Sequence, residues 1–166
     1  SYSYQMLRGD DFYRFVRQRL AGHPGIDWMQ ASVEKLGEDG EGPYAQVDGR
    51  RLRARWIFNS CLSPRQSDGQ YYRLLQHFRG WTIETESDAF DPLAATLMDF
   101  RTPQQGNARF CYLLPLSTRR ALVEFTVFSG QCLPEDDYRE ALESYIRHRL
   151  GIDSYTILEK EAGVIP

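Results

Sequence analysis

Two stretches of sequence, RFCYLLPL at residues 109–116 and ALVEFTVF at residues 121–128, decide the fold class of this chain. Both are rich in aliphatic, aromatic and β-branched residues, and the short polar segment 117–120 separates them. That composition is typical of strands, and such a short connection is typical of an antiparallel pair. Segments 71–84 and 96–102 have the same character, with turn residues between them. We therefore expect the second half of the chain to form a larger, mainly antiparallel sheet.

Two other segments have the periodicity of helices. After the acidic start Gly9-Asp10-Asp11, apolar residues recur every three or four positions up to Leu20, which predicts a helix with one apolar stripe. Residues 138–150 repeat this spacing after Pro134, and the following glycine is well placed to end the helix.

The remaining segments predict further strands. Residues 26–62 are expected to form a small antiparallel meander, in which the Asp48-Gly49 pair indicates a tight hairpin turn. A last strand is expected at residues 155–158. The sequence therefore predicts an α+β fold, predominantly antiparallel β-sheet with two main helices.

Composition and charge exclude several functional classes. The net charge of −3 and the pI near 5.6 argue against a nucleic-acid binder, which normally has a basic face. No segment approaches the roughly 18 apolar residues of a membrane-spanning helix. Cys61, Cys111 and Cys132 form no CxxC motif and no cluster with His, so we expect neither a metal site nor a disulfide framework. A reducing, cytoplasmic compartment fits best.

Two carboxylates lie in the middle of predicted apolar strands, Asp99 in TLMDFR and Glu124 in ALVEFT. A turn near Gln105-Gly106 would place Asp99 opposite Cys111 or Tyr112, and a turn at residues 117–118 would place Glu124 near Cys111. The two carboxylates would then flank one middle strand, about 10 Å apart at the backbone. We expect both side chains on the same face, where they could line one pocket, although a slip of one residue would separate them.

Each carboxylate has two interpretations. An ionised carboxylate is costly to bury alone, so each could form a structural ion pair, with Arg101, Arg119 or Arg120 as candidate partners. Alternatively, an apolar site raises the pKa of a carboxylic acid, which can then hold and deliver a proton. The residues alone leave both interpretations open.

Residues 72–166 resemble lycopene cyclases over nearly their whole length. Their motifs occur in the family's order: QHFRGW at 76–81, FDP at 90–92, TLMDFR at 96–101, FCYLLPLS at 110–117, RALVEFT at 120–126 and GVIP at 163–166. Glu124 matches the first Glu of the family's F-L-E-E-T segment and Thr126 matches its Thr, whereas Phe125 replaces the second acid. The final motif resembles the start of the family's G-x-I-P-M segment.

Residues 1–63 resemble flavoproteins related to the aromatic hydroxylases. Arg8 precedes a helix as in their Arg-x-x-Leu region, and ARWIFNS at residues 54–60 resembles a strand that ends near the flavin. The resemblance implies an internal fragment of an FAD-dependent hydroxylase/reductase-like fold. Residues 1–63 would be part of the flavin-domain region, a helix plus a β-meander, and residues 64–166 a substrate-side β-sheet with one helix. The Gly-x-Gly-x-x-Gly dinucleotide loop is absent from this sequence.

The resemblance implies cyclisation of the linear end groups of lycopene to ionone rings, in carotenoid biosynthesis, without net redox change. Glu124 is the expected proton donor or cation stabiliser, and Asp99 its partner. The other expected site residues are Arg101, Phe125, Phe100 and Tyr112 for the substrate, and Arg8, Gly163, Ile165 and Pro166 for the cofactor. That cofactor would be reduced FAD, with NAD(P)H as the reductant of the flavin. Because lycopene dissolves in membranes, the enzyme is expected to be cytoplasmic and peripheral to the bilayer.

Two alternatives belong to other classes. One is a flavin reductase or hydroxylase acting on isoprenoids, against which the Met98-Asp99 and Glu124 motifs argue. The other is a non-catalytic module that binds an apolar ligand on the same sheet, and its support is the missing dinucleotide loop. A Gly-x-Gly-x-x-Gly motif upstream of these residues would distinguish an enzyme from a binding module.

Overall fold

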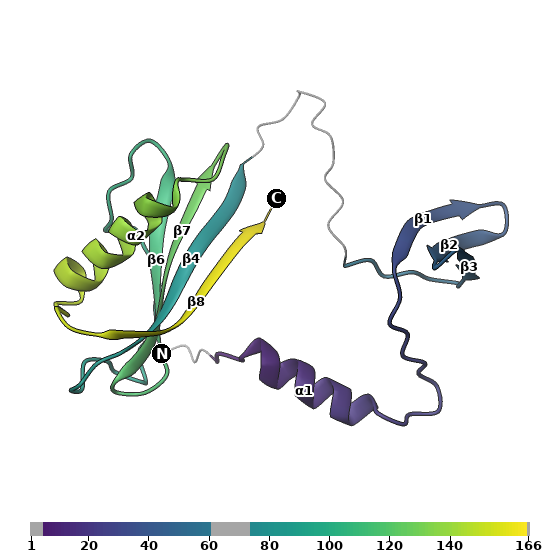
Figure 1. The fold of residues 1–166 in the computed structure, drawn as a ribbon, viewed down its shortest axis with the longest axis horizontal. Helices are drawn as coiled ribbons and strands as arrows, with labels where there is room; N and C mark the ends of the chain where they lie inside the picture. The colour runs from purple at the N-terminus through teal and green to yellow at the C-terminus, as the bar shows by residue number, and fades with distance from the viewer. Residues whose placement is uncertain (1–4, 61–73, 166) are drawn as a thin grey trace. The chain divides into compact units, whose positions relative to one another are not determined.

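The computed structural model describes residues 5–60 and 74–165. It divides the chain into two compact units, Ser1–Ser63 and Pro64–Pro166. The described residues form two α-helices, a π-helical turn, and antiparallel sheets of three and five strands (Figure 1). The predicted α+β class with predominantly antiparallel sheet is therefore confirmed.

The first unit contains one helix and a small sheet. Helix α1 spans Gly9–Leu20, as predicted, and the large side chains of its apolar stripe are exposed. Strands β1 (Val33–Asp39), β2 (Gly42–Val47) and β3 (Arg50–Arg53) form an antiparallel meander.

The predicted hairpin turn joins β2 to β3. Asp48 and Gly49 both have positive φ, 47° and 72°, and two consecutive positive φ values are characteristic of the tight turn that an Asp-Gly pair favours. The antiparallel meander is thus confirmed, but its strands lie within Val33–Arg53 and not over all of residues 26–62. Of the predicted range, Cys61 and Leu62 lie outside the described residues.

The second unit is built on a five-stranded antiparallel sheet with the order β5-β6-β7-β4-β8. Its strands are β4 (Leu75–Glu84), β5 (Thr96–Asp99), β6 (Ala108–Pro115), β7 (Arg120–Ser129) and β8 (Thr156–Ile165). Strand β7 lies in the centre, between β6 and β4, so its backbone pairs with a neighbouring strand on both sides. This sheet positions both carboxylates that the sequence singles out.

Helix α2 (Glu135–Ser144) packs on one face of this sheet, which we call the helix face (Figure 1). The helix continues into a π-helical turn, η1 (Tyr145–Arg149), in which Leu150 N–H donates to the carbonyl of Tyr145. Gly151, at φ 70°, then ends it, as expected from the sequence. The core lies between this helix and the sheet and includes Trp81, Ile83, Val123, Phe125, Val127, Tyr138, Leu142 and Ile146.

Strand β8 is longer than the sequence predicts. We expected it to span residues 155–158, but it continues through Glu159, Lys160 and Glu161 to Ile165. The sequence did not predict this extension because the run Glu159–Glu161 is charged, and charged residues are unfavourable in central strands. They are common on edge strands, and β8 is one edge of this sheet.

Candidate functional site

The two carboxylates lie on opposite faces of the sheet. Asp99 on β5 is in register with Cys111 on β6, which is in register with Phe125 on β7. Glu124 is instead in register with Tyr112. Residues in register share a face, and neighbours along a strand do not. The prediction that Asp99 and Glu124 share one face is therefore wrong.

The loop between β6 and β7 explains the error. Pro115 pairs with Ala121, which places the tip of the loop at Thr118 rather than between Ser117 and Thr118. This moves Glu124 by one residue, from the predicted partner Cys111 to Tyr112. A shift of one residue in register transfers a side chain to the other face.

Asp99 is held in a network of charged and polar groups on the helix face. Its side chain is 3% exposed, and it accepts hydrogen bonds from Arg101 Nε at 2.7 Å and Nη2 at 2.8 Å. The hydroxyl of Tyr145 donates to it at 3.0 Å, and Arg149 Nε lies 3.7 Å away. These contacts join β5 to the end of the helix.

This network sets the protonation of Asp99. Hydrogen bonds from the Arg101 side chain, together with its backbone N–H and the Tyr145 hydroxyl, lower the pKa of Asp99 to about 2, against the opposing effect of burial. Such a group is ionised at neutral pH and is a poor proton donor. The geometry supports the structural ion pair for Asp99.

The other two candidate partners are engaged elsewhere. Arg119 Nε donates to the carbonyl of Thr85 at 3.0 Å, and Arg120 forms an ion pair with Glu84 at 2.7 Å. Of the three arginines that the sequence offered, Arg101 is thus the one that pairs with Asp99.

Replacing Asp99 by Asn should lower the free energy of unfolding by about 1–3 kcal/mol at pH 7, because buried hydrogen bonds to a charged group are lost. The pKa of Asp99 is lowered from 3.8 to about 2, so its contribution is full above pH 4 and is lost as the pH falls through 2. Denaturant unfolding at pH 7 and at pH 2 measures the difference. An Asn variant as stable as the parent at pH 7 would contradict the structural role.

Glu124 lies at the centre of the other face, which we call the Glu124 face and define by Gly80, Phe110, Tyr112, Leu122, Glu124 and Phe128. Its side chain is half-buried, and Thr126 Oγ1 donates to its Oε1 at 2.8 Å. Burial raises the pKa of Glu124 from 4.5 to about 7, and the nearby Glu161 adds to this, whereas the Thr126 hydroxyl lowers it. An acid with a pKa near the working pH is suited to giving and taking a proton.

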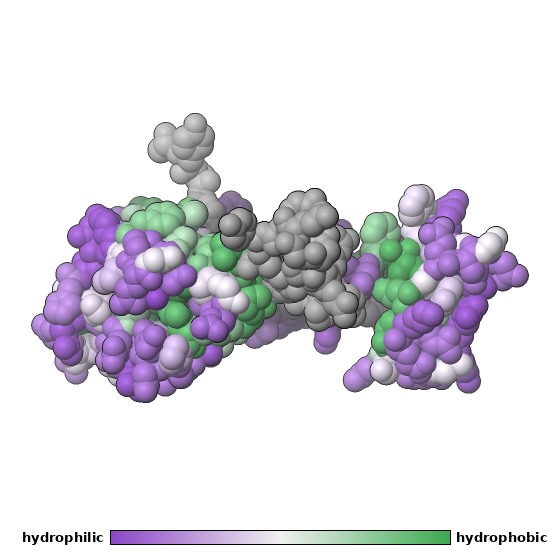
Figure 2. All heavy atoms as spheres, turned by 90° about the horizontal axis from the view of Figure 1, so that it is seen from above, coloured by the Kyte–Doolittle hydropathy of each residue, from purple (hydrophilic) through white to green (hydrophobic). Residues whose placement is uncertain are grey.

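Aromatic rings surround the buried Phe110 on this face. The ring centroid of Phe110 lies 5.2 Å from that of Phe100, 5.3 Å from Tyr112 and 6.1 Å from Phe128. In Figure 2, apolar side chains (green) reach the surface of this unit between hydrophilic ones (purple). The face thus combines π systems with one titratable acid, a setting that suits an extended apolar ligand.

The structure divides the residues predicted to bind substrate. Phe100 and Tyr112 belong to the aromatic cluster on the Glu124 face. Phe125 is 1% exposed on the helix face, where its ring packs edge-on against Tyr138 with centroids 6.4 Å apart. Arg101 is bound to Asp99.

Two further residues at this site were missed from the sequence, Gly80 and Glu161. Glu161 on β8 is in register with Gly80 on β4, which is in register with Glu124 on β7. The alternation in the sequence does not place Glu161 there, because a register shift between Thr82 and Ile83 puts Ile157 opposite Ile83 of the core and Glu159 opposite Thr82 on the Glu124 face.

Of the residues predicted to bind the cofactor, Gly163 has a packing role in the sheet. A Cβ at Gly163 would lie 2.4 Å from Cζ of Phe78, so a glycine there gives room to the Phe78 ring. Ile165 ends β8, and Arg8 precedes α1 in the other unit. Pro166 lies outside the described residues.

The described residues do not fit the pyrophosphate of a dinucleotide. Helix N-termini bind phosphates through free N–H groups and a positive dipole end. Here the first turns of α1 and α2 are both acidic, with Asp10 and Asp11 in one and three carboxylates from Glu135 on in the other. No Gly-x-Gly-x-x-Gly turn leads into either helix.

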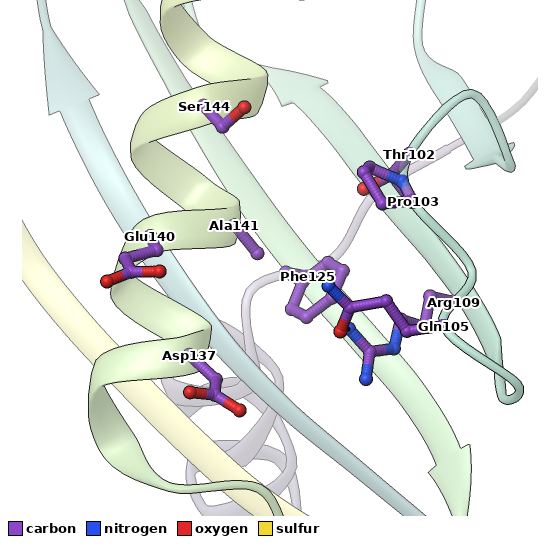
Figure 3. Close-up of a pocket in the computed structure, with 9 residues that line it drawn as sticks. All are labelled: Thr102, Pro103, Gln105, Arg109, Phe125, Asp137, Glu140, Ala141 and Ser144. Carbon is purple, nitrogen blue, oxygen red and sulfur yellow. Dashed lines mark hydrogen bonds between the residues drawn. The ribbon is translucent and has the colours of Figure 1, made fainter.

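A pocket of about 280 Å³ opens on the helix face, between α2 and the loop before β6 (Figure 3). It is lined by Thr102, Pro103, Gln105, Arg109, Phe125, Asp137, Glu140, Ala141 and Ser144. The guanidinium of the buried Arg109 donates from Nη1 to Gln105 Oε1. These charged and amide groups are unsuited to a hydrocarbon chain, and the sheet separates the pocket from Glu124.

Residues 5–60 and 74–165 contain neither a metal-site cluster nor a membrane-spanning helix. Among them, no cluster of three or more His, Cys, Asp or Glu side chains has the arrangement of a metal site. No helix there has both the length and the apolar character needed to cross a bilayer.

Comparison with known proteins gives one match. The family model described as "Lycopene cyclase protein" matches residues 1–166, the whole chain. No curated protein and no solved structure matches the chain significantly.

Proposed function

The chain belongs to the lycopene cyclase family, and we propose that Glu124 is the acid with which it cyclises the linear end groups of lycopene. The observation that carries this proposal is a carboxyl group with a pKa of about 7 among aromatic rings. Family membership supports a carotenoid substrate and a role in carotenoid biosynthesis. The Glu124 face supplies the chemistry that such a substrate needs.

The reaction begins with proton transfer from Glu124 to the terminal double bond of the substrate. The resulting carbocation is attacked by a second double bond, which closes the ring and moves the positive charge into it. Loss of one proton then restores a double bond, so one proton enters, one leaves, and the product is an isomer of the substrate. After the first step, the Glu124 carboxylate is ionised and can accept the departing proton.

The surroundings of Glu124 stabilise the charged intermediate. A carbocation near the face of the half-buried Tyr112 gains cation–π attraction, which is stronger where water is excluded. The ionised carboxylate adds Coulomb attraction at the moment the cation exists. Asp99, on the opposite face of the sheet, takes no part in these steps.

The solubility of the substrate in lipid determines where in the cell the enzyme would meet it. A C40 hydrocarbon partitions into the bilayer, so the enzyme would meet it at the membrane surface as a peripheral protein. The half-buried apolar side chains of the Glu124 face, Phe78, Leu122 and Phe128, are suited to contact with such a chain.

Reduced FAD, regenerated by NAD(P)H, is part of the proposal through family membership. Since the described residues do not fit its pyrophosphate, the steps above use the chain's own residues alone.

Conversion of lycopene in D₂O by the complete protein with reduced FAD tests this proposal. Protonation from an exchangeable carboxyl should place one deuterium in the product for each ring formed, with no other change in atomic composition. Mass spectrometry measures both. A product with two added hydrogens or an added oxygen would indicate a reductase or hydroxylase instead, and binding of lycopene without conversion would indicate a binding module.

A further inference from the structure

We propose that Glu161 is a positioning residue for Glu124, and that the two carboxyl groups share one proton across Gly80. This role rests on the proposed function, in which Glu124 must carry a proton at neutral pH. It assigns a task to a residue on the edge strand β8 that the sequence motifs leave without one.

The sheet register brings the two side chains into one row. Glu124, Gly80 and Glu161 are direct neighbours on β7, β4 and β8, so all three belong to the Glu124 face. Two strand spacings separate the backbones of the two glutamates by about 10 Å. Two Glu side chains can span this distance only if they lean toward each other over the strand between them.

Gly80 provides the space for this approach. A Cβ at Gly80 would lie 2.6 Å from Oε1 and 2.7 Å from Cγ of Glu161, closer than real Cβ contacts. The side chain of Glu161 therefore lies over β4, directed inward from the edge toward the strand that carries Glu124, and its proximity raises the pKa of Glu124. Any larger residue at position 80 would displace it.

Among the groups that face Glu124, Glu161 is its main acid–base partner. Tyr112 is opposite it on β6, and Thr126 holds its Oε1. Glu159, two residues before Glu161, lies on the same face of β8. Among the nearby cations, Arg120 is paired with Glu84 at the strand ends, and Lys160 lies over the Trp81 ring on the helix face.

Two carboxyl groups in contact do not both ionise readily, because their like charges repel. One proton held on Glu124 between them removes this repulsion. Burial keeps the proton on the Glu124 side, and Glu161, which is exposed at the sheet edge, connects the pair to solvent. A proton consumed at Glu124 can thus be replaced through Glu161.

The test compares pH profiles of the complete protein and its Glu161→Gln variant. A Gln removes the second charge and donates a hydrogen bond to ionised Glu124, so it should lower the pKa of Glu124. Conversion of lycopene should then fall off about one pH unit lower than in the parent, a loss of about 5-fold at pH 7 with near-parent activity at pH 5. Glu159→Gln, on the same strand and face, is the matched control and should leave the profile unchanged.

A second measurement does not depend on activity. Titration of the glutamate side-chain carboxyls by ¹³C NMR, without substrate, should show Glu124 titrating near pH 7 in the parent and closer to its ordinary range in Glu161→Gln. Gly80→Ala should act in the same direction while keeping both acids, because the new Cβ displaces Glu161.

The outcomes separate the two proposals. An unchanged Glu124 titration in Glu161→Gln would overturn the shared proton, even in a protein that cyclises lycopene. A shifted titration in a protein without cyclase activity would keep the shared proton and overturn the proposed function.

Discussion

Replacing Glu124 by Gln in the complete protein should lower lycopene conversion per folded enzyme by at least about 100-fold, the lower range for loss of a general acid. Gln keeps the size of the side chain and can still accept the hydrogen bond from Thr126 at the same position. It has no proton to give at any accessible pH. The measurement is product formed per folded enzyme, with folding checked by circular dichroism.

The fold should tolerate this change. The pKa of Glu124 is raised from 4.5 to about 7, so its ionisation opposes folding, and the parent loses stability as the pH rises across that range. The Gln variant lacks this loss and should be at least as stable at pH 8. Glu84→Gln, which removes an acid from the end of the same sheet, is the control and should retain most activity. Near-parent conversion by the Glu124 variant would remove Glu124 from the mechanism.

Replacing Phe125 by Ala should lower the free energy of unfolding by about 3–5 kcal/mol, the usual range for deleting a buried aromatic ring. The side chain is 1% exposed and packs against Tyr138 beneath α2, so its loss leaves a cavity that the rigid sheet cannot fill. Denaturant unfolding measures the change, which is a large fraction of the roughly 5–15 kcal/mol by which folded proteins are usually stable.

Phe128→Ala is the matched control on the same strand. Phe128 is half-buried on the Glu124 face, so its removal should cost less stability and act mainly through a higher KM for the substrate. The opposite pattern, a stable Phe125 variant with a raised KM, would assign substrate contact to Phe125 and contradict its place in the core.

Local signals in the sequence predicted the elements of this fold well. The strands of residues 109–116 and 121–128, the helix ended by Gly151 and the Asp48-Gly49 turn all depend on short-range periodicity or on backbone preferences of single residues. Such preferences act within a few residues, so they are readable without knowledge of the tertiary structure.

The register of the sheet was not readable in the same way. It depends on how many residues the loop between β6 and β7 contains and which of them forms the tip, here Thr118. An error of one residue is small in sequence but reverses the faces, and it placed Asp99 and Glu124 together when the sheet separates them. The true neighbour of Glu124, Glu161, comes from a strand more than thirty residues later in the chain.

The alternation along β7 has a consequence for how this protein can change over generations. Val123, Phe125 and Val127 face the core, whereas Leu122 and Glu124 face the other side. Adjacent codons therefore come under different selection: one set is constrained by the need to stay folded, the other by the ligand it meets. Substitutions that adapt the protein to a new end group or product can accumulate at the positions that face the ligand. The alternate positions, which face the core, then keep the fold unchanged.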